Sequence, residues 1–217
     1  MTLGEAVGLS DGQERLLTRG LQAALAALAA YGVATGSWGT AVNGAAALAA
    51  TFLPALIRRE YGYAMDPGLV LWIAVAVFLN ALGFAGLYEQ YQWYDEITHT
   101  VSGTIIAGIG YASFRAVEEH SGEVDAPPAF RAAFVVVFVL AAGVVWELLE
   151  FASEQLAGAL GADAPLVVYG VDDIVTDMIF NGVGGLVVAL WGSDYVGGFT
   201  GFLRDRLGGG EDPPADG

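Results

Sequence analysis

Three short stretches of the sequence carry acidic side chains and one histidine at helical spacing: "YDEITHTVSG", "VVWELLEFASEQ" and "VDDIVTDMIFNG". In each stretch the polar residues recur three or four positions apart, which places them on one face of an α-helix. Carboxylate oxygens together with an imidazole nitrogen form a ligand set for a hard or borderline divalent cation. Carboxylates can also act as general bases. The residues concerned are Asp95, His99, Glu147, Glu150, Asp173, Asp177 and Asn181.

The elements that must position these side chains are apolar and long. Of the 217 residues, 55% are hydrophobic and 15% are charged, and the mean hydropathy is +0.56. Stretches of about 17–25 apolar residues can cross a bilayer as helices. No ten-residue alternation typical of an outer-membrane barrel is present. The sequence predicts an all-α polytopic membrane protein, a bundle of six transmembrane helices at Leu16–Gly36, Thr40–Ile57, Leu69–Leu87, Ile97–Arg115, Arg131–Phe151 and Ile174–Trp191.

This pattern divides the chain into three parts. Residues 1–15 form an acidic segment that lacks the basic start and apolar run of a signal peptide. Residues 16–193 form the six-helix membrane domain, with the polar site region at 93–190. Residues 194–217 form a Gly-rich acidic tail.

The basic residues predict the orientation. With six spans, every arginine falls on the same side of the membrane, and the positive-inside rule makes that side cytoplasmic. We therefore expect a multi-pass protein of the cell membrane with both termini in the cytoplasm. The arginines are Arg15, Arg19, Arg58, Arg59, Arg115, Arg131, Arg204 and Arg206.

The balance of acidic and basic residues limits the classes of binding partner that we expect. The net charge is −16, and all eight basic residues are arginine. Such acidity without lysine predicts a halophilic protein adapted to high salt, where solvent ions screen the carboxylates; an ordinary acidic protein is the alternative. Nucleic acid is not expected as a partner because the sequence has no basic patch, whereas membrane lipids are. The absence of cysteine excludes disulfides and thiolate metal sites.

The predicted topology brings the three polar stretches to one membrane face. The fourth helix starts there, the fifth ends there and the sixth starts there, so their polar faces should converge on a pocket at the outer side. For Asp95, Glu96, Asp172 and Asp173 the alternative role is capping of a helix N-terminus. The expected metal ligands are Asp95, His99, Glu147, Asp173 and Asp177, with Asn181 also in the pocket.

These motifs also carry a family resemblance. "YDEITHTVSGTIIAG", "VVWELLEFASEQ" and "DDIVTDMIFNGVGG", in that order, resemble the YjdF-like family of uncharacterised membrane proteins. More distantly they resemble the VanZ-like family associated with glycopeptide resistance. The resemblance spans Trp93 to Leu190 and implies no particular reaction. It implies a shared polar site at Asp95, His99, Glu147, Glu150, Asp173 and Asp177.

Two functions compete for such a pocket. One is a membrane enzyme that uses Mg²⁺, Mn²⁺, Ca²⁺ or Zn²⁺ to act on a lipid-linked or envelope substrate, with Glu147 or Glu150 as general base. The other is a cation or proton transporter that uses the same carboxylates. The sequence disfavours transport, because the inner halves of the helices offer no matching polar relay. A structural bundle is the third alternative, and the oligomeric state is left open.

Overall fold

The computed structural model describes residues 8–161, 164–191 and 195–208, and this part of the chain is entirely helical apart from turns and loops. The all-α class predicted from the sequence is confirmed. The helices are α2 (Asp11–Thr35), α3 (Trp38–Ala50), α4 (Leu53–Tyr61), α5 (Pro67–Leu82), the π-helix η1 (Gly83–Leu87), α6 (Tyr88–Gln90), α7 (Gln92–Ser121), α8 (Pro128–Leu160), α9 (Val171–Trp191) and α10 (Gly197–Gly208).

The long apolar segments have membrane dimensions. Among the described residues, five segments are long and apolar enough to span a membrane: Asp11–Thr35, Trp38–Tyr61, Pro67–Gln90, Pro128–Leu160 and Val171–Trp191. Helix α7 has 30 residues and therefore sufficient length, but its polar start, which includes Asp95 and His99, lowers its hydropathy. The predicted count of six spans is thus approximate.

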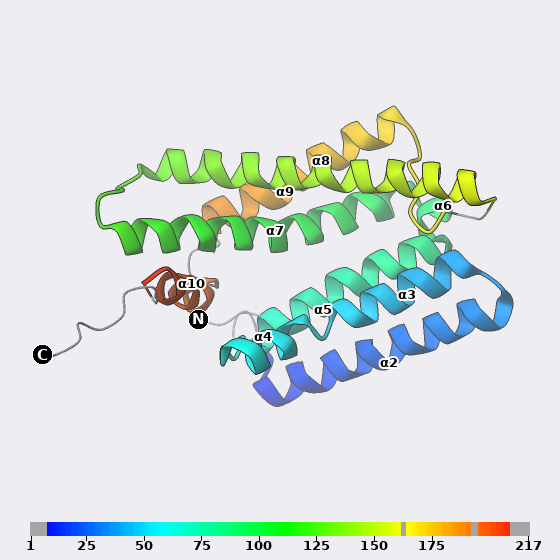
Figure 1. Cartoon of the computed structure of the whole chain (residues 1–217), viewed down its shortest axis with the longest axis horizontal. Helices are drawn as coiled ribbons and strands as arrows, with labels where there is room; N and C mark the ends of the chain where they lie inside the picture. Colours follow the sequence, from blue (N-terminus) through cyan, green and yellow to red (C-terminus); the bar gives the residue numbers. More distant parts are fainter. Residues whose placement is uncertain (1–7, 162–163, 192–194, 209–217) are drawn as a thin grey trace, which may run out of the picture.

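The long helices pack in two groups (Figure 1). Helices α2, α3 and α5 pack on one another, and α7, α8 and α9 form the second group. Contacts between α5 and α7 join the two groups, and the indole N–H of Trp72 donates to Thr104 Oγ1 across this junction at 2.9 Å. All three polar stretches lie in the second group.

Glycines permit the closest approach within the second group. A Cβ atom at Gly184 of α9 would lie 2.6 Å from the backbone oxygen of Thr100 in α7. A Cβ at Gly103 of α7 would lie 3.0 Å from the backbone oxygen of Asn181. Small residues at such crossings let helix backbones touch in a membrane. This contact sets the register that brings the start of α7 beside the start of α9.

A π-helical turn interrupts the end of the third long segment. Gly86 lies within it at a φ of 123°, a conformation that favours glycine. A Cβ at Gly83 would lie 2.1 Å from the ring of Tyr88, so this glycine makes room for the tyrosine. Such π-turns occur often at functional sites, and this one directs Phe84 and Tyr88 toward the polar residues of α7.

An apolar layer fills the second group below its polar end. Ala107, Val135, Val139 and Val188 form a buried cluster with exposed fractions of 8% or less. At 1.5 Å per residue, Ala107 lies about 12 Å along α7 from His99. The polar stretches are therefore separated from the opposite end of the bundle by tightly packed hydrocarbon.

Helix α10 was not predicted from the sequence, which suggested only a tail in this region. Its aromatic side chains pack at the end of the bundle that carries Arg15, Arg58, Arg59 and Arg131, which we call the arginine-bearing end. There the rings of Phe202 and Tyr63 stack with their centroids 4.6 Å apart. Arg204 Nη1 lies 3.5 Å from Glu119 Oε2 at the end of α7. The sequence of this helix is rich in glycine and therefore shows no clear hydrophobic periodicity. Tertiary contacts between aromatic rings stabilise the helix.

Candidate metal centre

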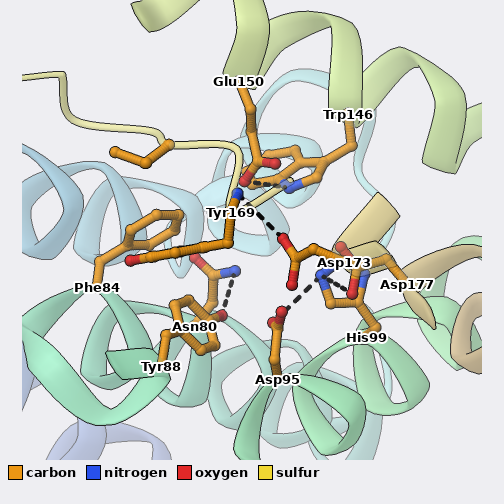
Figure 2. Close-up of a pocket in the computed structure, with 11 residues that line it drawn as sticks. Asn80, Phe84, Tyr88, Asp95, His99, Trp146, Glu150, Tyr169, Asp173 and Asp177 are labelled. Atoms are coloured by element: carbon orange, nitrogen blue, oxygen red, sulfur yellow. Dashed lines mark hydrogen bonds and ion pairs between the residues drawn. The ribbon is translucent and has the colours of Figure 1, made fainter. Parts of the chain in front are cut away.

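Three side chains from two helices meet at the polar end of the bundle (Figure 2). His99 Nε2 lies 3.3 Å from Asp95 Oδ1, one turn earlier on α7, and 3.6 Å from Asp177 Oδ1 on α9. One ligand atom of each residue lies within 4.8 Å of the other two. The side chains are 17%, 12% and 3% exposed for Asp95, His99 and Asp177. This group could hold a metal ion.

The second nitrogen of His99 faces Asn181. His99 Nδ1 and Asn181 Nδ2 are 3.3 Å apart, so in this arrangement the amide donates and the proton of a neutral imidazole is on Nε2. Metal coordination through Nε2 would require the proton on Nδ1, and a 180° turn of the amide would offer Asn181 Oδ1 as its acceptor. Asn181 therefore helps to orient the ring of His99 and can pair with either neutral tautomer.

Glu147 is a buried carboxylate of α8. It is 8% exposed, and neither carboxylate oxygen has a hydrogen-bond partner among the described residues. The charged side chains that act on it electrostatically include His99, Asp173 and Asp95. A buried carboxylate without a partner costs free energy. Glu147 is not among the residues that line the cavity beside Asp95, His99 and Asp177.

Unlike Glu147, the other two predicted carboxylates, Glu150 and Asp173, line the same cavity as Asp95, His99 and Asp177, and both already have donors. Glu150 Oε1 accepts a hydrogen bond from the indole N–H of Trp146 at 3.0 Å. Asp173 Oδ2 accepts from the backbone N–H of Tyr169 at 3.2 Å, so it binds the loop before α9. The structure thus separates Asp95, His99 and Asp177, which approach one another closely, from Glu147, Glu150 and Asp173 around them.

The cavity between these groups is small, with a volume of about 10 Å³. That is roughly the space of one water molecule, and it suits a single ion. The lining residues are Asn80, Phe84, Tyr88, Asp95, His99, Trp146, Glu150, Val167, Tyr169, Asp173 and Asp177.

Several of these residues were not identified as site residues from the sequence. Asn80 Nδ2 donates to Tyr88 Oη at 3.2 Å, and Tyr88 Oη lies 3.1 Å from Thr98 Oγ1. Thr98 Oγ1 in turn lies 3.2 Å from Asp95 Oδ1. This chain of hydrogen bonds connects α5 to the carboxylate of Asp95. The only signal in the sequence was the lone Asn80 in an apolar helix, because its partners become neighbours only through the π-turn.

The segment 164–170 crosses above the cavity. The backbone N–H groups of Leu166 and Val168 donate to Ser153 Oγ and Glu154 Oε1, both at 3.2 Å. The amide of Asn43 in α3 donates to the carbonyl of Pro165. Burial raises the pKa of Tyr169, and the neighbouring carboxylates, Glu89 first, raise it further. Tyr169 therefore presents a protonated hydroxyl at this end of the molecule.

The comparisons with known proteins agree with this membrane architecture. A family described as "Predicted membrane protein (DUF2238)" matches residues 16–197. The chain belongs to the DUF2238 family. The matched range includes every residue of the candidate metal centre. Searches of curated proteins and of solved structures found no match.

Membership of the DUF2238 family supports the prediction of an uncharacterised membrane protein family. The more specific resemblances to YjdF-like and VanZ-like proteins are not confirmed by these comparisons. The description of the DUF2238 family states no reaction, so function has to be argued from the site.

Proposed function

We propose that this protein binds a divalent cation at Asp95, His99 and Asp177 and uses it in a reaction on a lipid-linked or envelope substrate. The observation that carries the proposal is the convergence of three ligand atoms, from Asp95, His99 and Asp177, within 4.8 Å of one another. Among the described residues, no arginine lines this cavity. A cation is therefore the chemical species that would offset the negative charge.

The donor set fits a metal. Two carboxylates and one imidazole supply oxygen and nitrogen ligands that Mg²⁺, Mn²⁺, Ca²⁺ and Zn²⁺ accept in different proportions. The buried carboxylate of Glu147 on α8 is a further candidate ligand, because it has no hydrogen-bond partner among the described residues. The Tyr88–Thr98–Asp95 hydrogen bonds and the Asn181–His99 contact would hold two of the ligands in place.

The surroundings favour chemistry at the mouth of the cavity. A bound divalent cation would polarise a phosphoryl or ester oxygen of a substrate. Glu150 lines the cavity, and its carboxylate is oriented by Trp146, so we assign it the role of general base. A volume of about 10 Å³ leaves no room for a whole substrate, which would therefore present only its reacting group.

The location follows from the charge distribution. The arginines at the starts of α2 and α8, and those in α4, lie at the end of the bundle opposite the site, which the positive-inside rule assigns to the cytoplasm. We therefore propose an outer-leaflet site in the cell membrane, cytoplasmic termini and, from the net charge of −16, a salt-rich environment. Accessibility of single cysteines introduced at Ser121 and Gly161 to an impermeant label in intact cells tests the orientation. Labelling of Ser121→Cys but not Gly161→Cys would invert it.

Transport is supported less well. The cluster of Ala107, Val135, Val139 and Val188 lies between the site and the arginine-bearing end, and a dehydrated ion would have to cross it. Burying an ion in such an apolar layer is costly. Binding and reaction at one face require no such path.

Metal analysis of the purified protein tests the proposal. About one divalent ion per chain is expected, lost in both His99→Ala and Asp177→Ala. His120→Ala is the matched control, since His120 is exposed at the other end of α7 and its loss should leave the metal content unchanged. A metal-free wild type whose proton or cation flux in liposomes depends on Asp177 would replace the enzyme proposal with transport.

A further inference from the structure

A second, larger cavity lies at the arginine-bearing end of the bundle, in the group of helices that does not carry the metal centre. Its volume is about 560 Å³, within the range of small-molecule sites. It is bounded by α2, by the α3–α4 connection with α4, and by the start of α5. The cavity is therefore independent of the candidate metal centre.

The mouth of this cavity concentrates positive charge. Arg15, Arg19 and Arg58 line it, in a chain with eight basic residues and 24 acidic ones. Arg19 and Arg58 form no ion pair among the described residues, and Arg15 has one long contact of 3.6 Å with Asp11 at the surface.

The one carboxylate that lines the cavity is already engaged. Asp66 Oδ1 accepts the backbone N–H groups of Gly68 and Leu69 at 3.0 and 3.3 Å and so caps α5. Three arginines line the cavity, against Asp66 and the buried Glu14 that lies next to Arg15 on α2. Guanidinium groups are thus in surplus, and they suit phosphate oxygens through paired N–H donors.

The walls are mainly apolar and lead toward the membrane interior. Phe52, Pro54, Ala55 and Val70 line them, and Phe52 is 48% exposed. Deeper along α2, Gln22 Nε2 donates to Thr51 Oγ1 at 3.1 Å and ties α2 to the α3–α4 connection. An occupant of this cavity would thus meet charge at one end and hydrocarbon along its length.

We propose that this cavity binds an anionic phospholipid of the leaflet on the arginine side. The phosphate would lie between Arg19 and Arg58, and part of an acyl chain would lie along Phe52, Ala55 and Val70. Basic pockets between transmembrane helices recognise anionic headgroups in this way. The site gives the protein a preference for anionic over zwitterionic lipid.

Spin-labelled phosphatidylglycerol and spin-labelled phosphatidylcholine are the probes. The full-length protein is reconstituted in phosphatidylcholine liposomes, and the fraction of each probe immobilised by the protein is measured by electron paramagnetic resonance. The wild type should prefer phosphatidylglycerol. Arg58→Gln should reduce that preference about fivefold, the factor expected for one basic side chain at an anionic lipid.

Two further variants make the result specific. Arg59→Gln is the matched control: Arg59 is the next residue on α4, is 80% exposed beside Glu60 and does not line the cavity, so its loss should change the preference less than twofold. Ala55→Trp fills the cavity without changing charge and should also reduce the preference. Circular dichroism and size-exclusion profiles like those of the wild type establish that the variants are folded.

Several outcomes would overturn the lipid assignment. Equal losses in Arg58→Gln and Arg59→Gln would mean diffuse attraction to the surface. An unchanged preference in Ala55→Trp would exclude occupation of the cavity. Displacement of the probe by inorganic phosphate alone would mean that the arginines bind a free anion, and a wild type without any preference would remove the proposal entirely.

Discussion

Two buried glutamates at opposite ends of the molecule have nearly equal exposure but opposite surroundings. Glu118, near the end of α7, is 6% exposed, and Glu147 of α8 is 8% exposed. The carboxylate of Glu118 accepts the backbone N–H of Ala126 at 2.9 Å and lies 3.0 Å from Arg115 Nη1 and 3.2 Å from Arg131 Nε. Neither oxygen of Glu147 has a partner among the described residues.

The difference shows that burial of the same residue type can stabilise a fold in one place and cost free energy in another, depending on the partners of the carboxylate. A buried carboxylate stabilises a fold only when charged and polar partners replace the water it has lost. Glu118 has such partners and joins α7 to α8 and their connection. Glu147 has no such partner among the described residues, so its burial costs stability.

The largest expected effect concerns the partnered glutamate. Glu118→Ala leaves Arg115 and Arg131 without their buried partner, and we expect the free energy of unfolding in detergent micelles to fall by about 3 kcal/mol. Chemical unfolding followed by tryptophan fluorescence measures this. Glu123→Ala, at an exposed position in the same connection, is the control and should change the value by less than about 0.5 kcal/mol. Equal effects of the two variants would contradict the structural role of Glu118.

The next effect tests whether the contact between Asn181 and His99 supports binding of the proposed divalent cation. Asn181→Leu removes the side chain that orients His99, and we expect the affinity for the divalent cation to fall about 10–100-fold. Isothermal titration calorimetry with the metal found in the purified protein measures the affinity. Asn43→Leu, which removes an amide that contacts the loop at Pro165 instead, should retain more of the metal affinity. If Asn181→Leu binds metal as tightly as the wild type, His99 needs no such orientation.

A smaller effect of opposite sign is expected at the unpartnered glutamate. Glu147→Gln removes a buried negative charge, so the metal-free protein should become more stable by about 1 kcal/mol. The same variant should bind the cation more weakly, because an amide oxygen is a poorer ligand than a carboxylate. A loss of stability in metal-free Glu147→Gln would show that Glu147 has a structural partner after all.

The smallest effect is a pH dependence at Glu118. Its burial alone would raise the pKa, but the N–H of Ala126 and the positive charges of Arg115 and Arg131 lower the pKa below 4.5. Because the folded-state pKa is the lower one, the stabilisation is fully present above the unfolded value of about 4.5 and is lost as the pH falls through the folded value. The stability difference between the wild type and Glu118→Gln should therefore shrink on acidification. A difference that stays constant with pH would contradict this ionisation.

Local periodicity predicted a large part of this architecture. The apolar stretches and their lengths indicated membrane helices, and the four-residue spacing of Asp95 and His99 placed both on one face of α7. The alternation of helix direction brought the ends of the polar stretches to one side. These features depend on the chain's own helical geometry and need no knowledge of neighbours.

Other features could not be obtained this way. The π-turn around Gly86, the contact of Tyr88 with Thr98 and the hydrogen bond from Asn43 to the loop at Pro165 all depend on residues far apart in the sequence or on a local break in helical geometry. Helix α10 was not predicted, because its glycines give no hydrophobic periodicity. The cavity at Arg19 and Arg58 was not predicted, because the sequence analysis used these arginines only to assign the membrane orientation.

The sequence by itself thus determined which side chains are available, on which helical faces they lie and toward which end of the bundle. Only the tertiary structure decided which of them meet. The close crossing at Gly103 and Gly184 brings His99 to Asp177, while Asp173 binds a backbone N–H of its own loop and Glu147 has no partner among the described residues. The physical reason is that helical spacing is a local property of the backbone, whereas the distance between two helices depends on the packing of every side chain between them.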